Sequence, residues 1–171
     1  RNTFYYHFQD KYELINWVFY TDMLQNVNSF NDPSKLTDSF LNVCKCLYAN
    51  RKFYLACFQY VGQNSLYEYL NDLYYEMWKI NIDMRYSESG FKLTESELQL
   101  MAKMKAHSLV GIISDWVKDG MRDNYMSYFE QVHAVLEFEA SGYAHLTEER
   151  MLGEHMEKAN MIGRKKCLKV C

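Results

Sequence analysis

Apolar residues recur at helical spacing along most of the chain, and no segment alternates in the way a half-buried strand does. The clearest stripe follows Thr94 and consists of Leu98, Met101, Ala102, Leu109, Ile112, Ile113, Trp116 and Val117. Thr94 and Glu97 form a predicted capping box at its start, and Gly120 is a suitable terminator at its end. The pattern therefore predicts a long helix between these two signals.

Similar signals predict the other helices. Asp10 and Glu13 form a second capping box, and the residues after it are apolar around most of the circumference. We expect that helix, from Tyr12 to about Asn28, to be buried on more than one side. Asp32 and Pro33 suit another helix start. Apolar positions at helical spacing then mark residues 40–48, 53–61 and 66–86, and helices are expected over about 125–145 and 147–161.

The composition agrees with long helices and with one globular body. The 171 residues include one proline and seven glycines, too few for the many turns of an all-β chain. Hydrophobic residues make up 49% and charged residues 24%, which excludes wholesale disorder. The predicted fold class is all-α.

Charge and cysteine content restrict the partners. The net charge of −3 gives no global attraction to nucleic acid or anionic lipid, so any contact with DNA must be local. No apolar run reaches the length of a membrane span, so we expect no membrane partner. Five cysteines, an odd number, suit reduced thiols and a cytoplasmic location.

The opening residues, RNTFYYHFQDKYEL, carry a family resemblance. An aromatic-rich terminus is a poor free end, so we expect Arg1 not to be the natural start. The segment resembles the passage of TetR-family regulators from the recognition helix into the connecting helix, at Thr3, Phe4, Tyr5, His7, Phe8, Asp10, Lys11 and Leu14. Residues 111–121, GIISDWVKDGM, also resemble the penultimate helix of a subgroup that includes regulators of dihydroxyacetone kinase operons.

The resemblance implies a TetR-like helical bundle and a domain organisation in three parts. Residues 1–10 would be the C-terminal remnant of a helix-turn-helix domain whose earlier part lies upstream. Residues 11–146 would form the connector helix with the effector-binding and dimerisation domain, and residues 147–171 an extension. The implied function is a regulator that binds operator double-stranded DNA as a homodimer, with its affinity controlled by a small-molecule effector.

The candidate DNA contacts follow from the chemistry of a docked recognition helix. Early residues of such a helix face base edges, and its flanks face phosphates. Arg1, Asn2, Thr3 and Tyr6 offer hydrogen-bonding groups, whereas Tyr5, His7 and Lys11 suit phosphate contact. Phe4 and Phe8 are expected in the core.

Candidate effector and dimer residues lie further along the chain. Aromatic and methionine side chains can line a cavity with polar tips, although core packing remains the alternative for each one. The candidates on the middle helices are Tyr54, Phe58, Tyr67, Tyr74, Met77 and Trp78. The resemblance places the dimer on the last two long helices, with candidate contacts at Leu109, Ile112, Ile113 and Trp116.

Other chemistry is less well supported by the sequence. Cys44 and Cys46 point in different directions on a helix, whereas Cys167 and Cys171 lie one turn apart in a basic tail. No catalytic triad, metal-binding motif or phosphate loop is present, so we expect no enzyme, no cofactor, no metal and no catalytic residue. The alternatives are a metal- or redox-responsive sensor acting through cysteine or histidine (His107, His133, His145 and His155 lie far apart), and a protein-interaction adaptor that does not bind DNA.

Overall fold

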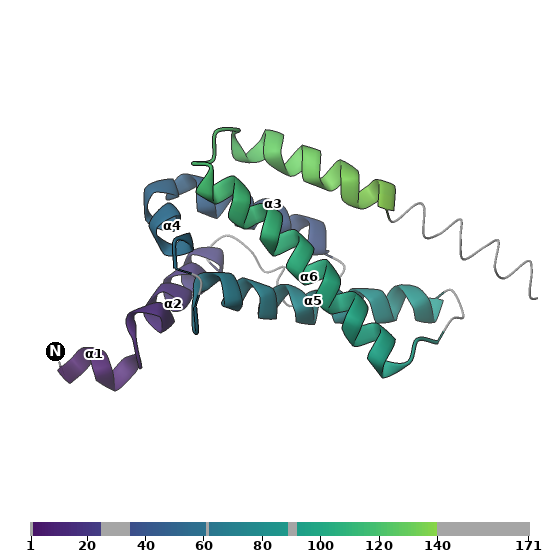
Figure 1. Ribbon diagram of the computed structural model, residues 1–171, viewed down its shortest axis with the longest axis horizontal. Helices are drawn as coiled ribbons and strands as arrows, with labels where there is room; N and C mark the ends of the chain where they lie inside the picture. The colour runs from purple at the N-terminus through teal and green to yellow at the C-terminus, as the bar shows by residue number, and fades with distance from the viewer. Residues whose placement is uncertain (1, 25–34, 61, 89–91, 140–171) are drawn as a thin grey trace, which may run out of the picture. The chain divides into compact units, whose positions relative to one another are not determined.

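The computed structural model describes residues 2–24, 35–60, 62–88 and 92–139. Figure 1 labels six helices, which are α1 (Asn2–His7), α2 (Lys11–Leu24), α3 (Leu36–Ala49), α4 (Arg51–Phe58), α5 (Leu66–Glu88) and α6 (Glu95–Lys118). A further helix covers residues 125–139. No strand occurs in these ranges, and the predicted all-α class is confirmed.

The helix predicted after Thr94 is α6, and both of its end signals are confirmed. The Thr94 hydroxyl accepts a hydrogen bond from the Glu97 amide at 3.3 Å, and the Glu97 carboxylate accepts one from the Thr94 amide at 2.8 Å. Gly120 has a φ of +81°, the left-handed conformation in which glycine commonly ends a helix. These two signals define a helix of 24 residues.

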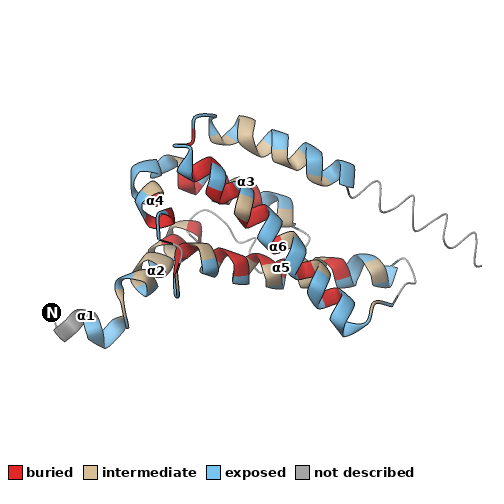
Figure 2. Ribbon diagram, viewed as in Figure 1, coloured by how far each residue is buried: buried red, intermediate tan, exposed pale blue. Residues whose placement is uncertain are grey.

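The core forms where one face of α6 packs along α5. The buried face of α6 includes Ala102, Val110 and Ile113, and α5 contributes Leu70 and Tyr74. Figure 2 shows this buried surface in red on α3, α5 and α6. Towards the far end of α5, a smaller cluster forms around Ile82, Leu98 and Ala102. Six of the eight residues of the predicted stripe are buried, whereas Met101 is partly buried and Ile112 is 40% exposed.

The connector helix α2 is less buried than its sequence predicts. Phe19 and Met23 are buried, and α2 contacts α3 and α5. Trp17 and Tyr20, however, remain 53% and 47% exposed. Among the described residues the expectation of burial on several sides is therefore wrong, because Phe19 and Met23 are the buried side chains of α2 while Trp17 and Tyr20 stay exposed.

Several predicted boundaries fall outside the described residues. These are the start at Asp32 and Pro33, the end of the helix expected over 125–145, the helix expected over 147–161, and the extension 147–171. The chain divides into two compact units, residues 1–129 and 130–171. In the second unit, residues 130–139 are described and are helical. None of the described helices combines the length and the apolar character that crossing a membrane requires.

The capping box makes a testable contribution to stability. Thr94→Ala removes the hydroxyl that accepts from the Glu97 amide, and loss of such a cap costs about 1 kcal/mol. We expect urea denaturation to show this loss in the free energy of unfolding of Thr94→Ala. Thr94→Ser keeps the accepting hydroxyl, so it should keep most of the stability of the wild type. A variant as stable as the wild type would show that the cap does not hold the start of α6.

Candidate functional site

The residues predicted to contact DNA lie on α1 and at the start of α2. Tyr5, Tyr6 and His7 of α1 are exposed, as is Lys11, the first residue of α2. The Lys11 ammonium lies 4.9 Å from the centre of the Tyr12 ring. Arg1 lies outside the described residues, and for Asn2 and Thr3 only the helical backbone is described. The exposed candidate DNA contacts therefore all lie between residues 5 and 11.

The start of α2 is tied to the loop between α4 and α5. Asn64 in that loop has a φ of +63°, and its side-chain Nδ2 atom donates to Asp10 Oδ2 at 3.0 Å. Its backbone carbonyl accepts from Asn16 Nδ2 at 3.0 Å. The rings of Tyr12 and Tyr60 stack with their centres 3.9 Å apart. The sequence does not predict these contacts, because they join residues about 50 positions apart.

Asp10 also caps α2. Its Oδ1 atom accepts from the amides of Tyr12 and Glu13, as the predicted capping box requires. The Glu13 carboxylate reaches back to the amide of Gln9, one residue earlier than expected. The bond from the Glu13 amide, followed by that from Asn64, lowers the pKa of the Asp10 carboxyl because both stabilise its charged form.

A second tie joins the last turns of α2 to α3 and α4. The Tyr54 hydroxyl of α4 donates to Asp22 Oδ2 at 3.0 Å, and Cys46 Sγ of α3 lies 3.5 Å from the same hydroxyl. Burial raises the pKa of the Tyr54 phenol, and its contacts with Cys46 and Asp22 raise it further. The hydroxyl therefore stays protonated and can act as a donor to the connector helix.

The six candidate effector residues occupy two environments. Four of them, Tyr54, Phe58, Tyr74 and Met77, are buried in the core. Tyr67 and Trp78 are partly exposed, and Trp78 packs on the smaller cluster around Ile82. Their role in binding an effector stays a prediction, and core packing accounts for the position of the four buried ones.

Two buried hydroxyls, those of Ser114 and Tyr128, have no hydrogen-bond partner among the described residues. The hydroxyl of Tyr74 is also buried and has Ser39 beside it. Burial raises the pKa of the Tyr74 phenol well above its usual value, and the neighbouring Cys44 and Tyr128 add to this effect. Because buried polar groups normally find a partner, the hydroxyls of Ser114 and Tyr128 are candidate contacts for a polar group from outside the chain.

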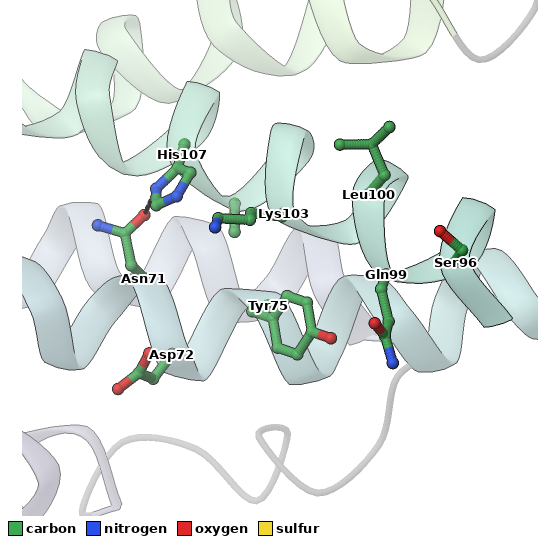
Figure 3. Close-up of a pocket in the computed structure, with 9 residues that line it drawn as sticks. Asn71, Asp72, Tyr75, Ser96, Gln99, Leu100, Lys103 and His107 are labelled. Carbon is green, nitrogen blue, oxygen red and sulfur yellow. Dashed lines mark hydrogen bonds between the residues drawn. The ribbon is translucent and has the colours of Figure 1, made fainter.

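An open groove of about 510 Å³ lies between α5 and α6 (Figure 3). It is lined by Asn71, Asp72 and Tyr75 from α5, and by Ser96, Gln99, Leu100, Lys103, Ala106 and His107 from α6. None of the six candidate effector residues lines it. The available signal in the sequence was the recurrence of polar residues at 96, 99, 103 and 107, but that spacing is equally typical of a solvated helix face.

The four candidate dimer residues are mostly internal to the chain. Leu109, Ile113 and Trp116 are buried, whereas Ile112 is 40% exposed. The exposed apolar side chains of α6 are Ile112, Leu100 and Met104, and a Cβ atom added at Gly111 would meet no atom within 4 Å. Whether the four predicted residues take part in a dimer stays a prediction.

The described cysteines, Cys44, Cys46 and Cys57, are free and buried. Burial raises the pKa of all three thiols, that of Cys57 to about 11. Across the described ranges, no group of three or more His, Cys, Asp or Glu side chains is placed to hold a metal ion. Cys167, Cys171, His145 and His155 lie outside those ranges. The described cysteines therefore have the character of core residues.

Thiol reactivity tests this assignment. A thiol with a pKa near 11 is only about 0.1% thiolate at pH 8, and burial slows the reagent further. We expect at most two of the five cysteines to react with Ellman's reagent within minutes in the native protein, and all five in guanidinium. Cys171→Ser should lower the fast count, and Cys44→Ala should not. Three or more fast thiols would contradict the assignment and favour a redox sensor.

Comparisons with known proteins address the family. Residues 34–138 match a family model described as a transcriptional regulator C-terminal region, of the TetR type. A search of the curated proteins found no match. The matched region runs from just before α3 into the helix after α6 and includes the groove, Tyr54 and the outer face of α6, but not Asp22 of the connector helix. Because it covers more than half of the 171 residues, the chain belongs to the TetR family of transcriptional regulators.

Proposed function

We propose that the protein is a ligand-responsive regulator that binds operator DNA as a dimer. The observation that carries the proposal is the hydrogen bond from Tyr54, a candidate effector residue, to Asp22 of the connector helix. A ligand that displaces the Tyr54 hydroxyl would break its hydrogen bond to Asp22 and so loosen the attachment of α2. Since α2 follows directly after α1, such a change would act on the candidate DNA contacts.

The proposed DNA contacts draw on exposed polar groups of unlike chemistry. Tyr5, Tyr6 and His7 offer hydroxyl and imidazole groups, and Lys11 offers a cation at the N-terminus of α2. The amides of Tyr12 and Glu13 at this end already donate to Asp10, so the Lys11 ammonium itself is the proposed phosphate contact. Since the whole chain carries a net charge of −3, this local set would have to supply the attraction to DNA.

The proposed coupling requires only that the effector bind two arrangements of α2 with different affinity. Two ties hold the helix, Asn64 at its start and Tyr54 near its end. The buried hydroxyls of Ser114 and Tyr128, which have no partner among the described residues, support an effector with hydrogen-bonding groups in the interior. The resemblance of residues 111–121 supports a place near the dihydroxyacetone kinase operon regulators, but it does not identify the ligand.

The proposed dimer uses the outer face of α6. Met104, Gly111 and Ile112 follow at helical spacing, and the absence of a side chain at Gly111 lets a second helix approach closely. A second copy of this chain is the proposed occupant, since the family resemblance places its dimer on the last two long helices. A two-fold pair would set the spacing between two DNA-reading segments.

The DNA contact is tested by the salt dependence of binding. The full-length protein is first used to select duplexes from random DNA. We expect Lys11→Gln to weaken binding to all duplexes and to reduce the slope of log K against log salt concentration by about 1, because one phosphate contact is lost.

The control is Lys45→Gln, which removes an exposed lysine from α3 and should leave the slope unchanged. An unchanged slope in Lys11→Gln would remove Lys11 from the interface. If the full-length protein binds no duplex in a salt-dependent way, the regulator proposal fails and the adaptor alternative is favoured.

The dimer is tested with Gly111→Arg. The new side chain starts in open space, so the fold of each subunit should persist, whereas a partner helix would be blocked. We expect the dimer Kd to rise by about 100-fold or more in sedimentation equilibrium, with an unchanged circular dichroism spectrum. Thr37→Arg adds the same charge on α3 and should leave the Kd unchanged. A wild-type protein that is monomeric at all concentrations would refute the dimer itself.

A further inference from the structure

The groove between α5 and α6 carries chemistry that the proposed function does not use. We propose that it binds a small organic carboxylate with a planar apolar body, of the size of a single-ring aromatic acid. This site is separate from the interior hydroxyls, and no group of the proposed DNA or dimer contacts is needed for it.

The first argument is that His107 is held in one tautomer. Asn71 is 7% exposed, and its Nδ2 atom donates to the Tyr67 carbonyl at 2.9 Å. That bond fixes the side-chain amide, so Asn71 Oδ1 is the atom that faces His107 Nδ1 at 2.7 Å. A carbonyl oxygen only accepts, and Nδ1 must therefore carry the proton. In the neutral ring His107 Nε2 is then an acceptor, so it can donate to a carboxylate only when the ring is protonated, as the imidazolium ion that donates from both nitrogens.

The second argument is a cation at the same end of the groove. Lys103 lies one turn before His107 on α6, and Figure 3 shows its ammonium directed towards the Asn71–His107 pair. No ion pair of Lys103 occurs among the described contacts, whereas Lys79 pairs with Glu95 at 2.8 Å. Figure 3 also shows the Asp72 carboxylate directed away from Lys103. Although Asp72 is also part of the lining, the Lys103 ammonium is thus the charged group placed to meet an anion beside His107.

The third argument concerns the rest of the groove. The Tyr75 ring is partly buried in its lining, and Leu100 is 60% exposed at its edge. These two side chains suit a planar apolar body, because an aromatic ring offers a flat apolar face. The volume of about 510 Å³ lies within the usual range for small-molecule sites. Together the three features describe an anion-binding end and an apolar end.

The experiment titrates benzoate into the full chain and follows it by calorimetry and by the ¹⁵N signals of His107. We expect saturable one-to-one binding with a Kd below about 1 mM, and a change in the Nε2 signal while Nδ1 stays protonated. Lys103→Met keeps the aliphatic stem and should weaken binding about tenfold, as expected for loss of a charge-assisted contact. Lys118→Met, also on α6 but outside the groove, should not weaken it.

Benzamide provides the test of charge, because it has the same ring without the carboxylate. We expect it to bind about tenfold more weakly than benzoate. The proposal is overturned if benzoate shows no saturable binding, if benzamide binds equally well, or if Lys103→Met and Lys118→Met behave alike. The assay contains no DNA, so failure here leaves the regulator proposal to be decided by its own salt-dependence experiment.

Discussion

The burial of one face of α6 against α5 is the contact on which the other features depend. Apolar surface removed from water contributes about 25 cal/mol per Å², and α5 and α6 share the most extensive contact among the described helices. With that face buried, the flank carrying Lys103 and His107 borders α5 and forms the groove. The face carrying Met104 and Gly111 is left outward. The packing of α6 against α5 thus determines both the surface proposed to bind a ligand and the surface proposed to bind a partner subunit.

Polar contacts, by contrast, attach the connector helix. Within the part of the chain that the structure describes, α2 has two buried side chains, Phe19 and Met23, so hydrophobic packing alone holds it less firmly than it holds α5 and α6. Asn64 at one end and Tyr54 near the other supply directed bonds that depend on geometry. Directed bonds of this kind can be exchanged for bonds to a ligand, whereas a packed apolar face must be separated as a whole. A regulator needs a movable element, and α2 has this character.

The sequence predicts the helices better than it predicts the surfaces. The capping residues Thr94 and Glu97 and the terminator Gly120 act locally, so their roles can be read from spacing. Leu109, Ile113 and Trp116 show the limit, because a stripe at helical spacing does not say whether the same chain or a partner covers it. The groove requires α5 and α6 to be placed side by side. The Asn64 contacts need two distant segments to meet, and neither arrangement has a signature in one segment.

The loop between α4 and α5 also makes the residues tolerated at positions 62, 60 and 12 depend on one another. A Cβ atom at Gly62 would lie 2.5 Å from the Tyr60 hydroxyl, so any larger residue there would push the ring from its place. That ring stacks on Tyr12 of the connector helix. A substitution at 62 is therefore felt at residue 12, and its effect depends on which residue occupies position 60. Such epistasis means that a larger residue at position 62 should be accompanied by changes at positions 60 and 12 among descendants of this protein.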